Sequence, residues 1–375
     1  MGSYSSEPEP QKLWIETPCI PSTPMSQAAG CNIFLKLENL QPSGSFKSRG
    51  IGNMMYKAML SQQQHPTGKP AHFYCSSGGN AGLACATAAI TLARPCTIVV
   101  PLSTSAFMIG KLRQLGAEVV QVGEHWAAAD AHMREHLLSA DEAGVYVPPF
   151  DHPDIWEGAA TMVDEMAVQL PPLLTANGIE GVSDGVPDAI VCNCGGGGLL
   201  NGVMEGVERQ TKKRWAPRGG AGPRRPRVLT VETVGADSLN ASAQAGEHVT
   251  IPKITSIATS LGATRVSAKT WEWYSRSAAA AADPSAPPAT DLTSVTVTDA
   301  EAVMGSARLA DDARILVEVA CGATIATVYN GELRRTLGKG LSDEEWAAMN
   351  VVVIVCGGSN ISLEMLSAYQ EKYGV

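Results

Sequence analysis

The chain has 375 residues, of which 45% are apolar and 17% are charged, and its formal net charge is −9. This length accommodates two packed α/β units, and the composition is globular, without an apolar run long enough to span a bilayer. The acidic balance argues against general binding to nucleic acid or to an anionic membrane, because both need a cationic face. We therefore expect a small-molecule substrate and no nucleic-acid or membrane partner.

Nine cysteines are spread singly along the chain instead of following the spacing of a disulfide framework. Such a pattern indicates free thiols in a reducing compartment. Residues 1–12 contain no apolar segment of the kind that directs secretion. We therefore expect a cytoplasmic protein.

Short apolar runs rich in β-branched residues alternate with longer Ala-rich amphipathic stretches. The runs predict strands, and the stretches, for example 80–93 and 106–115, predict helices. Apolar strands separated by helices are typical of parallel sheets covered on both faces, so the predicted fold is α/β with doubly wound parallel sheets. The strands are expected at 32–37, 72–75, 96–100, 117–122, 188–193, 227–232 and 350–355.

Two segments interrupt this alternation. Residues 212–227 are basic and rich in Pro and Gly, and residues 278–290 are of low complexity. A basic loop can contact RNA, but this one contains a single aromatic residue and stands between a predicted helix and a predicted strand. We interpret it as a solvated insertion.

One lysine stands out in QPSGSFKSRG (41–50), because Lys47 follows a Pro/Gly turn and lies directly beside Phe46. Ordinary surface lysines have polar neighbours. An apolar environment lowers the pKa of an amine and allows it to form a Schiff base with a carbonyl group. Lys47 is therefore a candidate for covalent attachment of a cofactor.

Three glycine-rich turns each follow a predicted strand and open a predicted helix, namely SSGGNAG (76–82), CGGGGLLNG (194–202) and CGGSN (356–360). In an open parallel sheet, ligands bind where strand carboxyl ends meet helix N-termini, and the free N–H groups there favour an anion. The four glycines from Gly195 to Gly198 remove every side chain that could keep a phosphate from the backbone.

The spacing of these glycines does not fit a dinucleotide site. Counted from Gly195 and Gly197, the third glycine of the fingerprint falls on Leu200, and no acidic residue completes the pattern on a neighbouring strand. A nicotinamide-dependent oxidoreductase is thus disfavoured. A phosphate cradle combined with a shielded lysine indicates pyridoxal phosphate instead, because this cofactor carries both an aldehyde and a phosphate.

The segments SGSFKSRG, SSGGNAG, CGGGGLL and VCGGSN, in this order, resemble the fold-type II pyridoxal phosphate enzymes, and most closely the serine/threonine ammonia-lyase (L-serine dehydratase) family. The likeness extends over most of the chain through YVPPFDHPDIWEGAA (146–160), PKITSIATSLGA (252–263) and ILVEVACGAT (315–324). It implies a lyase of amino-acid catabolism that converts L-serine to pyruvate and ammonia. L-threonine would give 2-oxobutyrate and ammonia in the same way.

The resemblance also implies how the chain is organised. A small domain would comprise residues 52–150, and a large cofactor-binding domain would comprise residues 1–51 and 151–375. Closure of the two domains would shield the lysine from water. Members of the family form homodimers, so we expect a homodimer.

Carried over to this chain, the resemblance makes Lys47 the Schiff-base lysine and general base, and it places Phe46 against the pyridine ring. Asn80 would bind the 3′ oxygen of the cofactor. The cofactor phosphate would lie on Gly195, Gly196, Gly197 and Gly198, and the substrate carboxylate on Ser77, Asn80 and Ala81.

The resemblance further implies that Cys356 faces the pyridine nitrogen. A thiol is too weak an acid to force protonation of the ring, which favours prompt loss of the β-hydroxyl over a long-lived carbanion. Taken alone, Cys356 would be interpreted as a small buried residue at a strand end, and the matched place of CGGSN favours the site instead. The family also has a monovalent cation site whose oxygen ligands suit K⁺. The matching residues are Gly195, Glu232, Ala236, Ser238, Leu261 and Ala263.

Gly78 departs from the family pattern, because many serine dehydratases have alanine there and the related serine racemase has serine. Glycine offers no acid or base, which favours elimination over racemisation, and it leaves the substrate less firmly packed. A β-replacement lyase of the cysteine synthase type shares the fold and cofactor and stays an alternative. A binding or regulatory protein on this scaffold is a second alternative.

HMREH (132–136) matches the H-x-x-E-H pattern of some metalloproteases, and His132 and His136 would share one helix face. The stretch lies within the region that resembles the lyases, so we interpret it as a solvated helix face and not as a zinc site. Cys192 and Cys194 alternate along one predicted strand, where we expect them to pack in the core.

Overall fold

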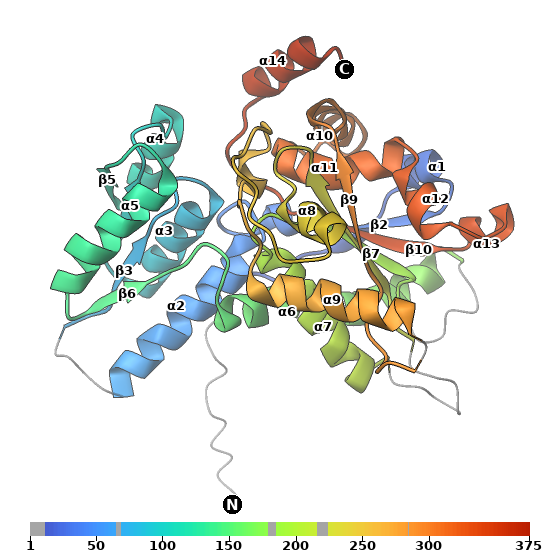
Figure 1. The fold of residues 1–375 in the computed structure, drawn as a ribbon, viewed down its shortest axis with the longest axis horizontal. Helices are drawn as coiled ribbons and strands as arrows, with labels where there is room; N and C mark the ends of the chain where they lie inside the picture. The colour runs from blue at the N-terminus through green and yellow to red at the C-terminus, as the bar shows by residue number, and fades with distance from the viewer. Residues whose placement is uncertain (1–11, 65–68, 179–184, 216–223, 284) are drawn as a thin grey trace, which may run out of the picture.

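The structure, a computed structural model, describes residues 12–64, 69–178, 185–215, 224–283 and 285–375. Its strands form two sheets with helices on both faces (Figure 1), which confirms the expected α/β fold. Within the described ranges, no helix has the length and apolar character needed to cross a membrane.

The larger sheet contains, in spatial order, β1 (Cys19–Pro21), β2 (Asn32–Lys36), β10 (Asn350–Ile354), β7 (Ala189–Asn193), β8 (Arg227–Thr233) and β9 (Leu292–Val297). All neighbours are parallel except β1, which pairs with β2 in the antiparallel direction. Every residue of β7 and β10 is buried. This burial is expected for central strands of a parallel sheet that is covered on both sides.

Helices cover both faces of the larger sheet. Figure 1 shows α6, α7 and α9 on one side and α10, α11 and α12 on the other. The helices of this part are α1 (Thr23–Ala29), α6 (Pro153–Ala176), α7 (Gly198–Lys213), α8 (Ser238–Ala245), α9 (Ala268–Ala282), α10 (Asp299–Ala313), α11 (Val319–Tyr329), α12 (Glu332–Leu337), α13 (Asp343–Ala347) and α14 (Leu363–Tyr373).

The smaller sheet is parallel throughout and contains β5 (Glu118–Gln121), β4 (Cys96–Val100), β3 (His72–Cys75) and β6 (Gly144–Tyr146). Its helices are α2 (Lys47–Gln64), α3 (Asn80–Leu92), α4 (Ala106–Gln114) and α5 (Trp126–His132). Successive side chains of its strands point to opposite faces of the sheet. Phe73 and Ile98 pack with α2, α3 and α4 on one face, whereas Tyr74 and Val99 pack with Met133 beyond α5 on the other.

Each strand predicted from the sequence is present, with ends that differ by at most one residue. The strands β1, β6 and β9 were not predicted. Two of them have three residues, and β9 alternates apolar residues with half-buried threonine and serine at the edge of its sheet. The low-complexity segment from residue 278 begins as the last turn of α9. Residues 216–223 of the basic segment lie outside the described residues.

Candidate active site

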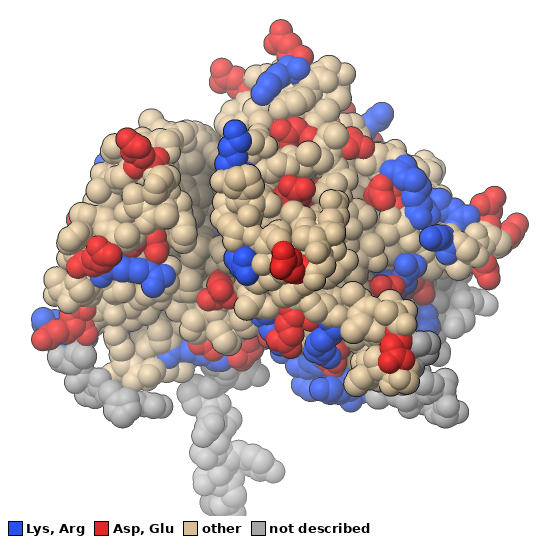
Figure 2. Space-filling view, in the orientation of Figure 1, with Lys and Arg blue, Asp and Glu red and all other residues tan. Residues whose placement is uncertain are grey.

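The residues singled out from the sequence lie at the carboxyl ends of strands in both sheets. Ser77 follows β3, Gly195 follows β7 and Cys356 follows β10, while Lys47 begins α2. Figure 2 shows that the surface is hollowed between the part that carries α3, α4 and α5 and the rest of the molecule. The candidate site therefore lies where the two sheets face each other, as expected for ligands of open parallel sheets.

The turn before Lys47 is tied to the end of β10. Gly44 has a φ of 78°, a conformation that favours glycine. Ser45 then forms an antiparallel bridge with Gly357, and the Phe46 N–H donates to the Cys356 carbonyl at 3.1 Å. The first residue of α2 is thus held directly beside the predicted partner of the pyridine nitrogen.

The Lys47 amine is part-buried and donates to the carbonyl oxygen of Pro149 at 2.8 Å. Its nitrogen lies 5.2 Å from the centre of the Phe46 ring. Burial lowers the pKa of Lys47 to about 8, although nearby acidic groups, including Glu318, oppose the shift. A substantial neutral fraction near pH 7 to 8 suits both capture of a carbonyl group and proton abstraction.

The four glycines form the turn from β7 into α7. In the described part of the chain, the N–H groups of Gly195 to Gly198 have no protein acceptor. Gly197 has a φ of 103°, and a side chain on Gly196 or Gly197 would overlap Phe150 or Thr270. The glycines therefore allow close packing against Phe150 and Thr270 and also leave the backbone accessible to a ligand. The free amides at the start of α7 fit a phosphate.

The turn from β3 into α3 offers a second group of free donors. The N–H groups of Asn80 and Ala81, the first residues of α3, have no acceptor among the described residues. The Ser77 hydroxyl is half-exposed and accepts from the Gly79 N–H at 3.3 Å. These groups fit a carboxylate at the positive end of the helix.

The buried carboxylate of Glu318 links the start of α3 to the turn after β10. Its Oε1 accepts from Asn80 Nδ2 at 2.9 Å and from the Asn360 N–H at 2.6 Å, and its Oε2 accepts from the Ser260 hydroxyl. Asn80 Oδ1 in turn accepts from the Ser359 N–H at 2.9 Å. Both sides of the hollow are thereby connected through the Asn80 amide.

Glu318 is not among the site residues predicted from the sequence, although the sequence contains a signal for it. Glu318 is the acidic residue within the apolar stretch ILVEVACGAT and directly precedes α11. A cavity of about 110 Å³ borders its side chain and that of Tyr369.

Cys356 lies two residues after β10 and is a buried thiol. Its sulfur accepts from Asn193 Nδ2 at 3.1 Å, and the same Nδ2 donates to the Ala320 carbonyl at 2.8 Å. Contact with Cys321, together with burial, raises the pKa of the Cys356 thiol well above its ordinary value. Cys356 therefore stays a neutral thiol, and Asn193, which was not singled out from the sequence, orients it.

One expectation about the turn CGGSN was wrong, because α14 does not begin there. Gly357 and Gly358 have φ values of 84° and 114°, and a Cβ at Gly358 would overlap the Glu318 carboxyl group. The helix begins only at Leu363. The turn instead places the backbone of Ser359 and Asn360 against α3 and Glu318.

The residues predicted to hold a cation include one buried carboxyl group, that of Glu232. Glu232 is fully buried and accepts from the Leu239 and Asn240 N–H groups at 3.0 and 2.7 Å. The Ser238 hydroxyl is buried and has no partner among the described residues. Of the other predicted ligands, Gly195 packs against the backbone of Leu261, Ala236 closes a turn with Thr233, and the Ala263 N–H donates to the Leu261 carbonyl at 2.7 Å.

The histidines and cysteines outside this site form no metal centre in the described part of the chain. The rings of His132 and His136 lie side by side with centroids 4.8 Å apart. No group of three His, Cys, Asp or Glu residues among the described residues is placed to hold a metal ion. All nine cysteines are free and buried, including Cys192 and Cys194.

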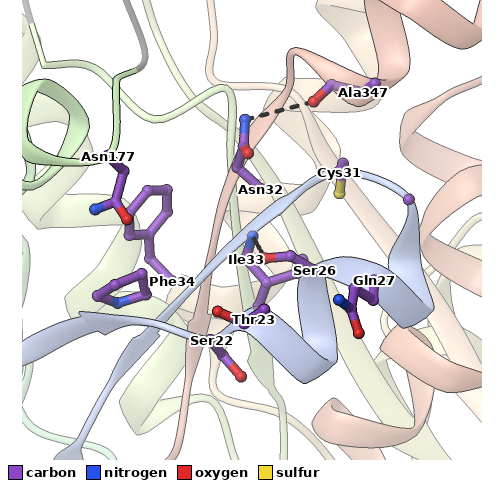
Figure 3. A pocket seen from close by; sticks show the side chains of 12 residues that line it. Ser22, Thr23, Ser26, Gln27, Cys31, Asn32, Ile33, Phe34, Asn177 and Ala347 are labelled. Atoms are coloured by element: carbon purple, nitrogen blue, oxygen red, sulfur yellow. Dashed lines mark hydrogen bonds between the residues drawn. The ribbon is translucent and has the colours of Figure 1, made fainter.

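A cavity of about 380 Å³ lies elsewhere, at the amino end of β2 (Figure 3). Two of its polar side chains have partners, because Ser26 Oγ accepts from the Ile33 N–H at 2.9 Å and Asn32 Nδ2 donates to the Ala347 carbonyl at 3.4 Å. No charged side chain and none of the predicted site residues line it. The chemistry is therefore assigned to the hollow between the sheets and not to this larger cavity.

The match with known proteins agrees with this geometry. The family model described as pyridoxal-phosphate dependent enzyme matches residues 11–357. The chain belongs to this family. The free amides after β7 and the part-buried Lys47 amine fit the phosphate and the aldehyde of that cofactor.

Two curated relatives and one solved structure are similar over nearly the whole chain. The L-serine dehydratase/L-threonine deaminase of Bos taurus is 40% identical over 97% of both chains. The catabolic L-serine/threonine dehydratase of Saccharomyces cerevisiae is 38% identical over 90% of this chain and 86% of that one. The crystal structure of a fungal L-serine ammonia-lyase from Rhizomucor miehei has a TM-score of 0.77 and 35% identity, and it covers 97% of this chain and all of that chain.

Proposed function

We propose that the protein is a lyase that converts L-serine to pyruvate and ammonia, and L-threonine to 2-oxobutyrate and ammonia. The observation that carries this proposal is the placement of Lys47, whose pKa is lowered to about 8, among the two groups of free helix amides and the neutral Cys356 thiol. The names of the bovine, yeast and fungal relatives support the same reaction.

Bound pyridoxal phosphate supplies the electron sink that makes the α-proton of an amino acid acidic. Lys47 would hold the aldehyde carbon, and Phe46 would pack against the ring. Asn80 would bind the 3′ oxygen, and Cys356 would face the ring nitrogen. The phosphate would be held by Gly195, Gly196, Gly197 and Gly198.

The residues of the chain then orient the substrate and move its proton. The N–H groups of Asn80 and Ala81 and the Ser77 hydroxyl bind the substrate carboxylate, which fixes the direction of the α-proton. Lys47, freed as a neutral amine when the amino group of the substrate displaces it, takes that proton, and the Pro149 carbonyl orients the amine. The β-hydroxyl leaves as water by taking up the proton that the substrate gave to Lys47, and a second water hydrolyses the unsaturated amine to the keto acid and ammonia.

The neutral thiol of Cys356 favours elimination over reactions that need a stabilised carbanion. Its raised pKa keeps it from acting as an anion beside the ring nitrogen. Gly78 provides no proton donor on the opposite side of the substrate, which disfavours racemisation.

A monovalent cation, K⁺, is proposed at Glu232 with oxygen atoms of Gly195, Ala236, Ser238, Leu261 and Ala263. Two features support it, namely a fully buried carboxylate without a cationic partner among the described residues and the unpartnered Ser238 hydroxyl. Neutral oxygens with a single carboxylate suit a monovalent cation.

Three further features remain proposals. The domain boundaries, 52–150 for the small domain and 1–51 with 151–375 for the large one, are supported by the membership of the two sheets. A cytoplasmic location is supported by nine free cysteines. A homodimer is supported by the family resemblance and is testable by light scattering during gel filtration.

The experiment that tests the function measures release of keto acid from L-serine and L-threonine by the purified, cofactor-loaded protein. We expect activity in the wild type and none with Lys47→Ala, because the variant lacks the amine that holds the cofactor and takes the proton. Lys57→Ala is the matched control, since Lys57 lies on the same helix and pairs with Asp154 at 2.8 Å. Cofactor binding without keto acid from either substrate would disprove the proposal and favour β-replacement or a non-catalytic role.

A further inference from the structure

A second lysine crosses the hollow between the two sheets. Lys111 lies on α4, beside the smaller sheet, and its Nζ donates to the main-chain carbonyl of Ser359 at 2.6 Å, in the turn after β10 of the larger sheet. The side chain is part-buried, and its nitrogen lies 4.2 Å from the centre of the Phe107 ring. The ammonium group is thus held between an aromatic face and a carbonyl oxygen.

Two side chains from the other side of the hollow form hydrogen bonds with the Ser359 backbone. Its N–H donates to Asn80 Oδ1 at 2.9 Å, while its carbonyl accepts from Lys111. The Ser359 hydroxyl donates to the Ser43 carbonyl at 3.3 Å, close to the turn that carries Lys47. The bond from Lys111 therefore holds the same backbone segment that orients the Asn80 amide.

The helix that carries Lys111 also supports the carboxylate-binding loop. Thr104, two residues before α4, packs so closely against Gly78 that a Cβ there would lie 2.7 Å from Thr104 Cγ2. Gly78 lies within the loop from Ser77 to Asn80. A shift of α4 away from Ser359 would therefore also disturb the loop that receives the substrate carboxylate.

Two opposing effects act on the pKa of Lys111. Burial lowers the pKa of Lys111, and the nearby Glu318 carboxylate opposes that shift by favouring the ammonium form. Hydrogen bonds from a charged donor are stronger than those between neutral groups. The Lys111 bond is thus a strong cross-link between the two sides of the site.

We propose that Lys111 is a positioning residue that clamps α4 and the carboxylate-binding loop onto Ser359. It touches no reacting atom, and the proposal rests on the proposed function for the identity of the substrate. If the clamp is lost, the binding-competent arrangement is populated less in the free protein. Apparent substrate affinity then falls in proportion to that population, whereas saturating substrate restores the closed arrangement and preserves kcat.

The test compares the cofactor-loaded wild type with Lys111→Met, Lys111→Arg and Arg113→Met. Arg113 is an exposed cation on the same helix and serves as the matched control. For Lys111→Met we expect KM for L-serine to rise about tenfold while kcat changes less than about threefold. Hydrogen exchange of the Ser359 and Asn360 amides should be faster in this variant, and Lys111→Arg should restore both readouts.

Unchanged KM and unchanged exchange in Lys111→Met would overturn the proposal, as would an equal effect of Arg113→Met. A fall in kcat alone, with exchange at Ser359 unaltered, would also overturn it. If the wild type releases no keto acid, the proposed function fails, but the exchange comparison still decides the role of Lys111 because it requires no turnover.

Discussion

At Gly78 the backbone does not require glycine, because its φ lies outside the left-handed region. The atom closest to a methyl group added at this position would be Thr104 Cγ2 at 2.7 Å, followed by Thr104 Oγ1 and Val100 Cγ1 at 3.2 Å. The Thr104 methyl is the end of a side chain and can rotate away. Gly78→Ala should therefore stabilise the fold by about 0.5 kcal/mol by restricting the unfolded chain. The firmer loop should lower KM for L-serine roughly threefold, the equivalent of a similar free energy.

Urea unfolding and steady-state kinetics measure these two effects. Gly110→Ala is the matched control, because it lies on α4 with nothing within 4 Å of its added Cβ. It should stabilise the fold by about 1 kcal/mol through helix propensity and leave KM unchanged. A higher KM in Gly78→Ala alone would show that Thr104 does not give way.

Single residues of the site differ in how far the sequence reveals them. Lys47 and the glycines stand in short motifs whose chemistry is local, so they were predicted before any fold was known. Glu318, Lys111 and Asn193 act through contacts between segments distant in the chain. No local pattern distinguishes Lys111 from a surface lysine or Asn193 from an ordinary strand end, and Glu318 differs from a helix cap only by its apolar sequence neighbours.

Among the elements, the start of α2 is anchored by a buried ionic cluster that holds Lys47 in place. Two residues after Lys47, Arg49 is fully buried and pairs with Glu38 at 2.7 Å and with Glu165 at 2.6 Å. Lys36 on β2 also pairs with Glu165, at 2.6 Å. Burial by itself lowers the pKa of the Arg49 guanidinium, but the carboxylates of Glu38 and Glu165 have the larger combined effect and raise that pKa. The cluster thus joins α2 to β2 and α6.

Arg49→Met should destabilise the protein by about 3–5 kcal/mol, because it leaves buried Glu38 without its charged partner. Urea unfolding measures the loss, and Arg335→Met is the control, since Arg335 pairs with Glu332 on the surface and should contribute about 1 kcal/mol or less. Equal stabilities of the two variants would contradict an anchoring role. Cofactor retention should fall only in Arg49→Met, because its helix presents Lys47.

The elements themselves were largely predictable. Continuous apolar runs such as β7 and β10 are buried on both faces, so sequence and burial agree residue by residue. The strand β9 was missed because its inner residues are half-buried and three of the four are polar, which is typical of an edge strand. The turn after β10 was misjudged because two glycines with positive φ delay α14.

At the scale of the whole molecule, the relation between the two sheets could not be predicted. The periodicity of each strand and helix reports which face is buried, but not which loop of one sheet meets which loop of the other. The contacts of Asn80 with Glu318 and Ser359 decide that arrangement. Figure 2 shows the hollow between the part that carries α3, α4 and α5 and the rest of the molecule.

The buried carboxyl group of Glu232, the proposed cation ligand, should make the stability of the whole molecule depend on pH and on K⁺. Burial raises its pKa from 4.5 to about 8. Its contribution to stability is therefore complete below about pH 4.5 and is lost as the pH rises through about 8. A bound K⁺ takes the place of the proton, so its apparent affinity should fall about tenfold for each pH unit below 8.

Thermal unfolding in potassium chloride and in tetramethylammonium chloride, at equal ionic strength, measures this linkage. The advantage of K⁺ in melting temperature should be larger at about pH 8.5 than at about pH 6.5, because less proton competes for the carboxylate. Glu232→Gln should abolish both the K⁺ advantage and its pH dependence. Glu205→Gln should preserve them, although burial also raises the pKa of Glu205, because Glu205 lies on α7 outside the proposed ligand set. Equal melting temperatures of the wild type in both salts at high pH would contradict a cation at Glu232 and leave its buried charge uncompensated.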